Sequence, residues 1–146
     1  DPCLINESSQ IFGSQCIVIS IDVKINSLGK YEVYTHSGKK PTGIDPLTLA
    51  TEVEQRGAGE ILLNSVDFDG TMKGYDIELI RIISESVSIP VIASGGAGNY
   101  ENMLKAIKIG KASAVAAASI FHFTEKTPLE AKIYLKENGI NTRVQI

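Results

Sequence analysis

Two aspartates two positions apart are the first residues in this chain whose types and spacing suggest chemistry. They are Asp67 and Asp69, which follow the apolar start of "LLNSVDFDGTMKGYD" (62–76). Twelve positions counted from Asp67 reach Glu78, which is the spacing of a calcium loop, but Met72 occupies the sixth position, where that loop requires glycine. Calcium binding is therefore not expected. Two interpretations stay open: the rim of a site at the end of a strand, or a turn stabilised by Asp and Gly.

A third acid stands beside a lysine at the end of another apolar run. The segment "SIDVK" (20–24) contains Asp22 and Lys24, whose side chains point to the same face if the segment is a strand. A carboxylate at the mouth of a strand can act as a general acid or base. The alternative is a structural ion pair between Asp22 and Lys24, and the residues alone do not decide between the two.

Glycine-rich turns form the third chemical feature. "IPVIASGGAGNYE" (89–101) runs from an apolar segment through Gly95 and Gly96 into a helix start. Backbone without side chains can approach an anion closely, and amides at a helix start point towards it. "AAASIFH" (116–122) offers a second set of amides at Ser119. Barrels hold phosphate in the loops after their seventh and eighth strands. Together the two turns predict a phosphate site, whereas "GGAG" alone is better explained as a tight turn.

These residues need strands that end side by side, and the sequence predicts four strands. The runs at 16–23, 60–66, 90–94 and 113–119 are apolar and nearly continuous, which is typical of strands buried on both faces. Helical patterns occupy 1–13, 45–57, 74–87, 99–110 and 127–139. A helix followed by four strand–helix units predicts an α/β fold with right-handed parallel crossovers.

The connection between the first strand and its helix is long. Within 24–43, the alternating "KYEVYTH" (30–36) follows a turn and predicts a small hairpin. Its tip, "THSGKK" (35–40), carries Ser37 and two lysines, and it either closes over an anionic ligand or is solvated. Long loops on an α/β scaffold usually carry function.

Four parallel units make half of a (β/α)8 TIM barrel, which takes about 250 residues. Left open, such a sheet has two edge strands that invite pairing. We therefore expect residues 1–146 to be half of such a barrel. Two alternatives stay open: two copies of the chain that complete each other, or an open sheet. The start at Asp1 without a methionine favours a piece of a longer chain.

Composition excludes several classes of protein. The 146 residues include 14 basic and 17 acidic side chains, a net charge of −3, so no basic footprint for nucleic acid is present. The apolar runs are too short to cross a membrane. Two cysteines without metal-binding spacing favour a reducing, cytoplasmic setting. His36 and His122 are far apart, so neither a zinc site nor another cofactor is expected.

The chain carries five segments in this order: "FGSQCIVISIDVK", "YEVYTHSGKKPTGID", "EVEQRGAGEILLNSVDFDGTMKGYD", "IPVIASGGAGNYEN" and "AAASIFHF". Together they resemble the second half of the cyclase subunit of imidazole glycerol phosphate synthase, over essentially the whole chain. The resemblance implies a barrel of two similar halves, each with a phosphate site, and it implies that residues 1–146 are the half that contains strands 5–8. It also implies a glutaminase partner that supplies ammonia, and a phosphoribulosyl aminoimidazole carboxamide ribotide as substrate.

The resemblance also implies roles for particular residues. Asp22 matches the catalytic carboxylate of the second half, with proton transfer during imidazole ring closure as its role. The residues implied to bind substrate are Ser37, Asn64, Asp69 and Gly70, and those implied to bind phosphate are Gly95, Gly96, Ala118 and Ser119. The family's other catalytic aspartate and a neighbouring lysine belong to the first half of the barrel. This half by itself is therefore expected to be inactive.

Three residues depart from the family's pattern. Asn64 stands where threonine is common, Phe68 replaces arginine, and Met72 replaces a lysine-like residue. Such changes are similar to those of a paralogous cyclase-like group found with sugar amidotransferases of surface-polysaccharide synthesis, in which the barrel delivers ammonia to another enzyme. Three functions thus stay open: a histidine-pathway cyclase, an ammonia-channelling paralogue, and a scaffold half-barrel that dimerises through its open sheet.

Overall fold

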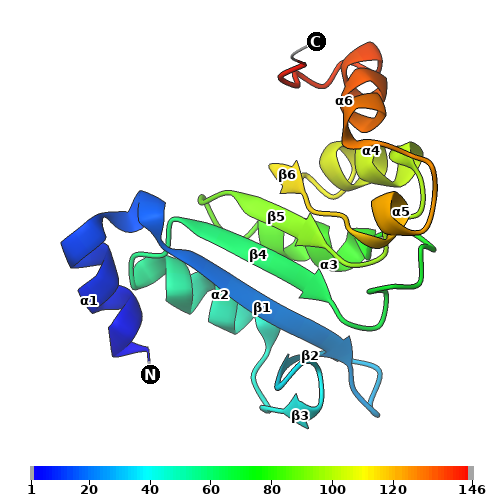
Figure 1. Ribbon diagram of the computed structural model, residues 1–146. Helices are drawn as coiled ribbons and strands as arrows, with labels where there is room; N and C mark the ends of the chain where they lie inside the picture. The colour runs from blue at the N-terminus through cyan, green and yellow to red at the C-terminus, as the bar shows by residue number, and fades with distance from the viewer. Residues whose placement is uncertain (1, 145–146) are drawn as a thin grey trace.

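The computed structural model describes residues 2–144, which form one six-stranded sheet with helices packed against it (Figure 1). The strands are β1 (Val18–Ile25), β2 (Tyr31–Thr35), β3 (Lys40–Pro41), β4 (Glu60–Ser65), β5 (Val91–Ser94) and β6 (Ala114–Val115). The helices are α1 (Cys3–Phe12), α2 (Pro46–Gln55), α3 (Ile77–Ser84), α4 (Tyr100–Lys108), α5 (Ser119–His122) and α6 (Pro128–Glu137), with a short 3₁₀ turn η1 (Ser14–Cys16) before β1.

The order of the strands confirms a parallel α/β sheet. The sheet runs β3-β2-β1-β4-β5-β6, with β1, β4, β5 and β6 parallel and the hairpin strands β2 and β3 antiparallel at one edge. The predicted hairpin is thus confirmed. The prediction of a strand over 113–119 is too long, because pairing ends at Val115 and the chain then turns into α5 at Ser119.

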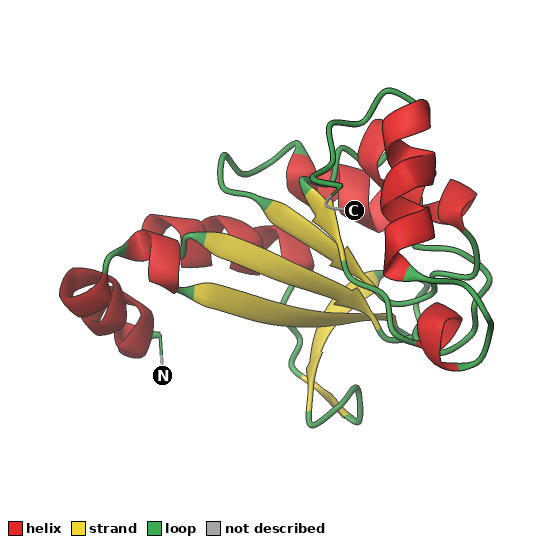
Figure 2. Cartoon of the chain, turned by 45° about the horizontal axis from the view of Figure 1, so that its top comes forward, coloured by secondary structure: helices red, strands yellow, loops and turns green. Residues whose placement is uncertain are grey.

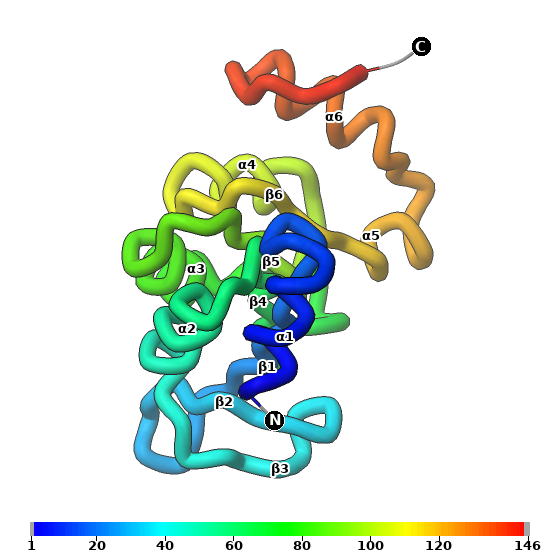
Figure 3. Tube along the Cα trace, turned by 90° about the vertical axis from the view of Figure 1, so that its left-hand side faces the viewer, coloured from blue at the N-terminus to red at the C-terminus, as the bar shows by residue number. Residues whose placement is uncertain are grey.

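The two faces of the sheet differ in burial. On β4, Ile61, Leu63 and Ser65 are buried, while the alternate residues Leu62 and Asn64 are half-buried. Helices α2, α3 and α4 cover the buried face, and Figure 2 shows the parallel strands in front of these helices. Figure 3 shows the same three helices in an arc along one side of the strands.

A sheet covered by helices on one side is the architecture of a barrel wall. A doubly wound sheet carries helices on both faces, whereas a (β/α)8 barrel carries them outside only. The parallel strands and their outer helices therefore match part of the wall of a TIM barrel. The sheet of this chain is not closed into a barrel. The inner face of that wall carries Asp22 and Asn64, so the candidate site residues lie on the face that the helices leave uncovered.

Capping residues set the starts of the helices. The Asp45 side chain accepts a hydrogen bond from the Thr48 backbone at the start of α2, and capping boxes at Asn99 and Thr127 begin α4 and α6. Helix α3 begins at Ile77, three residues later than the sequence predicts, with Asp76 as its cap. The predicted start is wrong because the preceding residues are buried in contacts with other loops.

The first and last helices lie at the periphery (Figure 1). Helix α1 is held by Asn6, whose side chain donates to the Arg56 carbonyl and accepts from the Arg56 guanidinium, each at 3.1 Å. Helix α6 packs on α4 through Tyr100 and Tyr134, whose ring centroids are 6.0 Å apart. The core lies mainly between the sheet and α2, α3 and α4, and α6 adds Ala131 and Leu135 to it.

Across residues 2–144, no helix combines the length and the apolar composition that crossing a membrane requires.

We expect Leu63→Ala to destabilise the fold strongly. Leu63 is 1% exposed on a central strand, so its truncation leaves a cavity and lowers the free energy of unfolding by about 3 kcal/mol. The control is Leu28→Ala in the hairpin turn, where leucine is 79% exposed and the loss should stay within about 0.5 kcal/mol. Urea unfolding followed by circular dichroism measures both, and equal losses would contradict this assignment of the core.

Candidate functional site

A cavity of about 180 Å³ opens at the carboxyl ends of β4, β5 and β6. Six of the residues that the sequence singles out line it, namely Asp69, Gly70, Gly95, Gly96, Ala118 and Ser119. Met72, Ser94, Ala97, Ala116 and Ala117 complete the wall. Ligands of α/β folds bind at this end of the strands, so the cavity is the candidate functional site.

Gly95 and Gly96 form the buried wall of the cavity. Their φ angles are +89° and +105°, a conformation that side-chain-bearing residues rarely adopt. A Cβ on Gly95 would lie 2.6 Å from the Ser65 carbonyl oxygen, and one on Gly96 would collide with the Gly74 carbonyl. Both positions therefore require glycine, and their backbone lies against the cavity with no side chain in between.

The opposite wall is the turn from β6 into α5. The first hydrogen bonds of that turn run from Phe121 and His122 to the Ala118 carbonyl, at 2.9 and 3.0 Å. Within residues 2–144, the backbone N–H groups of Gly95, Gly96 and Ala118 donate to no protein acceptor. Unpaired amides beside one cavity are donors suited to an anion such as phosphate.

The charge of the cavity is low and negative. Of its eleven lining residues, Asp69 is the one with an ionisable side chain. Met72 lies in the wall with φ +55°, and it brings no charge. An anion bound here is therefore held by backbone dipoles rather than by lysine or arginine, while Asp69 is exposed at the rim.

A row of polar side chains crosses the sheet beside this cavity. Asp22 on β1 pairs with Asn64 on β4, and Asn64 pairs with Ser94 on β5. The Asn64 amide donates a hydrogen bond to one Asp22 carboxylate oxygen at 3.1 Å. Since Ser94 lines the cavity and strands are about 4.8 Å apart, Asp22 lies about 10 Å from it. That separation suits a ligand with a phosphate at one end and a reacting centre further along.

Lys24 forms an ion pair with Asp67 and not with Asp22, the partner considered from the sequence. Its ammonium lies 3.9 Å from an Asp67 carboxylate oxygen and 5.4 Å from the centre of the Tyr34 ring. Asp67 also accepts a hydrogen bond from the Ile25 backbone at 2.9 Å. The ion pair with Asp22 is thus replaced by one with Asp67. Of the two aspartates in the starting motif, Asp67 ties two strand ends together and Asp69 lines the cavity.

Ser37 stands apart from the cavity. It lies at the turn between β2 and β3, with φ +56°. The following Gly38 is so close to Val66 that a Cβ would lie 2.5 Å from that side chain. The turn therefore rests on the carboxyl ends of β1 and β4, but Ser37 does not line the cavity with the other predicted residues.

The sequence did not reveal the role of the short buried segment 74–76. The Gly74 amide donates to the Gly96 carbonyl at 2.7 Å, and the Tyr75 hydroxyl donates to the Ala116 carbonyl at 2.9 Å. The Asp76 carboxylate accepts from the Tyr31 hydroxyl at 2.9 and 3.1 Å. An aspartate just before an apolar helical stripe is a cap signal that could have located the helix start, but nothing in the sequence indicates the contacts across the loops.

Burial raises the pKa of the Tyr75 hydroxyl well above its ordinary value. Burial raises the pKa of Tyr31 as well, and the hydrogen bond and charge of Asp76 raise it further. Both hydroxyls therefore stay protonated and remain donors at neutral pH.

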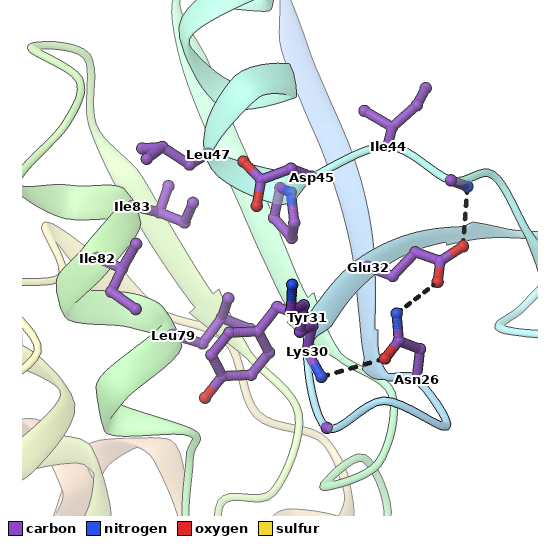
Figure 4. A pocket seen from close by; sticks show the side chains of 13 residues that line it. Asn26, Lys30, Tyr31, Glu32, Ile44, Asp45, Leu47, Leu79, Ile82 and Ile83 are labelled. Atoms are coloured by element: carbon purple, nitrogen blue, oxygen red, sulfur yellow. Dashed lines mark hydrogen bonds between the residues drawn. The ribbon is translucent and has the colours of Figure 1, made fainter.

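A larger hollow of about 630 Å³ lies away from the strand ends, between the hairpin, the start of α2 and α3 (Figure 4). Its carboxylates already accept hydrogen bonds from neighbouring groups. Glu32 accepts from Asn26 at 3.0 Å and from the Gly43 backbone at 2.8 Å, and Asp45 caps α2. The hydrogen bond from Asn26 is the main reason that the pKa of Glu32 is lowered. With its acceptors in use, this hollow is a weaker candidate than the amide-lined cavity.

No group of three or more His, Cys, Asp or Glu side chains in the described part of the chain could hold a metal ion.

The unclosed parallel sheet, the outer helices and the cavity at the strand ends define a portion of a (β/α)8-barrel protein with a candidate anion site. Residues 1–127 match the family described as "Histidine biosynthesis protein", and the chain belongs to that family. It is similar to "Imidazole glycerol phosphate synthase subunit HisF" of Chloroherpeton thalassium, with 54% identity over 144 residues. That alignment covers 99% of this chain and 57% of the relative, so the chain spans little more than half of that protein's length.

We expect Gly96→Ala to cost more stability than Gly29→Ala. Both glycines have positive φ, +105° and +73°, but a Cβ on Gly96 meets the Gly74 carbonyl and one on Gly29 meets nothing within 4 Å. Gly29→Ala should therefore cost about 1 kcal/mol of backbone strain. Gly96→Ala should cost about 2 kcal/mol more, because the neighbouring loop must move. Urea unfolding compares the two, and equal costs would contradict the close approach of the loops.

Proposed function

We propose that this chain supplies the second half of the barrel in a cyclase subunit of imidazole glycerol phosphate synthase, which acts in histidine biosynthesis. The observation that carries the proposal is the geometry of the strand ends: an amide-lined cavity and a carboxylate lie on one inner face, two strands apart, which is about 10 Å at the usual strand spacing. The family match and the 54% identity to a HisF subunit support it.

The cavity is proposed to hold one phosphate of the phosphoribulosyl aminoimidazole carboxamide ribotide. The amides of Gly95 and Gly96 approach it from one side, and those of Ala118 and Ser119 approach from the other. Such oriented dipoles bind a phosphate without contributing a net charge. Asp69 and Gly70 at the rim contact the substrate beyond the phosphate, and Ser37 reaches it from the hairpin turn.

Asp22 is proposed to move the proton during ring closure. Its carboxylate is half-buried on the inner face, and one oxygen receives the Asn64 amide. The side-chain nitrogen of Asn64 can only donate a hydrogen bond. It therefore fixes one oxygen of the Asp22 carboxylate and leaves the other oxygen for the reacting group. A positioned carboxylate contributes a factor of about 10² to 10⁴ in a proton-transfer step. Asn64 also contacts the substrate from its place between Asp22 and the cavity.

Two partners complete the proposed enzyme. The first is the complementary half of the barrel, which covers the inner face and brings the second catalytic aspartate, so that this half alone is inactive. The second is a glutaminase subunit, which supplies ammonia to the cyclase in the cytoplasm. The apolar side chains Leu4, Ile11 and Phe12 on α1, each more than 60% exposed, give the complementary half a surface to pack on.

A second candidate is a HisF-like barrel that channels ammonia for sugar amidation in surface-polysaccharide synthesis. The observation that favours it is the absence of any lysine or arginine among the cavity-lining residues of the described chain, where Met72 lies in the wall instead. A cavity with backbone donors alone would bind a phosphate more weakly than one with an added cation. The two candidates differ in whether imidazole glycerol phosphate is formed.

The test is turnover of the ribulosyl substrate with ammonium salts by the complete protein. The wild type should form imidazole glycerol phosphate, and Asp22→Asn should lower the rate by a factor of about 10² to 10⁴. Phosphate binding should stay within about twofold, because Asp22 lies two strands away from the amides.

Asp45→Asn is the matched control. This substitution also removes a carboxylate, here the one that caps α2. Asparagine caps a helix as well as aspartate does, so both turnover and stability should be unchanged. A folded wild type that binds phosphate but forms no imidazole glycerol phosphate would contradict the cyclase proposal and favour the channelling one.

A further inference from the structure

The two walls of the phosphate cavity come from different strands, and each is tied to the same short segment. The Gly95–Gly96 wall follows β5, and the Ala118–Ser119 wall follows β6. Segment 74–76 belongs to neither strand, since it follows β4. Its first residue bonds one wall and its second residue bonds the other, so one dipeptide links the two walls of the cavity.

The contact with the first wall is made through backbone alone. The Gly74 amide donates to the Gly96 carbonyl at 2.7 Å, which fixes the peptide plane between Gly96 and Ala97. The absence of a Cβ on Gly96 allows the two backbones to come this close. Gly74 therefore fixes the end of the first wall, one peptide plane beyond the Gly96 amide.

The contact with the second wall is made through a side chain. The Tyr75 hydroxyl donates at 2.9 Å to the carbonyl of Ala116, the first residue beyond the end of β6. Tyr75 is 4% exposed, and its ring belongs to the hydrophobic core, so the hydroxyl has a fixed position. The bond holds the chain where it leaves the sheet, two residues before the amide of Ala118.

We propose that Tyr75 is a positioning residue for phosphate binding, which holds the Ala118–Ser119 wall at the distance from the Gly95–Gly96 wall that one phosphate requires. The inference rests on the proposed phosphate site and adds to it a residue that does not touch the ligand. Strand β6 has two paired residues, and the Ala116 amide adds one bond to the Ala93 carbonyl at 2.8 Å, so the bonds to β5 reach Ala116. The Tyr75 hydroxyl adds a second bond at Ala116, to its carbonyl, where the chain turns away from the sheet.

The test is binding of inorganic phosphate to the complete protein and to Tyr75→Phe, followed by calorimetry and by the amide signals of Gly96 and Ser119 in nuclear magnetic resonance spectra. Phenylalanine keeps the ring and removes only the hydroxyl. The dissociation constant for phosphate should rise about tenfold, because the Ala118–Ser119 wall loses its fixed position. The Ser119 signal should lose more of its phosphate-dependent shift than the Gly96 signal.

Tyr31→Phe is the matched control. It removes another partly buried tyrosine hydroxyl, the one that donates at 2.9 Å to Asp76 in the same segment 74–76, and this bond reaches neither wall. Both variants should lower Tm by a few degrees, about 2–4 °C. Only Tyr75→Phe should weaken phosphate binding, and Tyr31→Phe should leave the dissociation constant within about twofold.

Each outcome bears on a different part of the proposal. Unchanged phosphate binding in Tyr75→Phe would overturn the positioning role while leaving the phosphate site in place. Equal weakening in both variants would also overturn it, because general loosening would then account for the effect. No phosphate binding by the wild type would overturn the site and the positioning role together.

A measurement on the wild type covers the case in which Tyr75→Phe does not fold. Phosphate should then slow hydrogen exchange of the Gly74 amide, which bonds the first wall, by more than it slows exchange of the Val33 amide in the hairpin. Equal slowing at both amides would contradict the coupling between segment 74–76 and the cavity.

Discussion

The backbones of Gly74 and Gly96 touch where the loops after β4 and β5 meet, and the candidate site depends on that contact. The 2.7 Å hydrogen bond leaves no room for a Cβ on Gly96, so the glycine is required by its neighbour as well as by its φ angle. A glycine in this conformation lets the backbone lie directly against the cavity. The close contact between these two backbones also brings Tyr75 to the end of β6. This one contact therefore orders the loops that follow β4, β5 and β6.

Burial of one face of the sheet explains where the polar residues lie. Helices α2, α3 and α4 take the apolar side chains of the strands, so Asp22, Asn64 and Ser94 remain together on the inner face. Parallel pairing then aligns these three side chains in one row. The polar row ends at the amide-lined cavity.

The sequence predicts the framework of this chain well, because the framework follows local rules. Near-continuous apolar runs identified the parallel strands, and Asp45, Asn99 and Thr127 marked helix starts through capping chemistry. Six of the predicted site residues line one cavity for the same reason, since carboxyl ends of parallel strands meet at one edge. The errors concern contacts between distant segments: the short β6 and the late start of α3 both follow from bonds that cross between loops. The partner of Lys24 and the position of Ser37 away from the cavity depend on such contacts too.

A crystal structure of the complete protein with inorganic phosphate tests most directly whether the strand ends form an amide cavity for phosphate. We expect phosphate oxygens at about 2.7–3.2 Å from the backbone nitrogens of Gly95 or Gly96 and of Ala118 or Ser119, with both walls engaged by one ion. A phosphate bound through lysine or arginine side chains elsewhere, with this cavity left vacant, would contradict the proposed site.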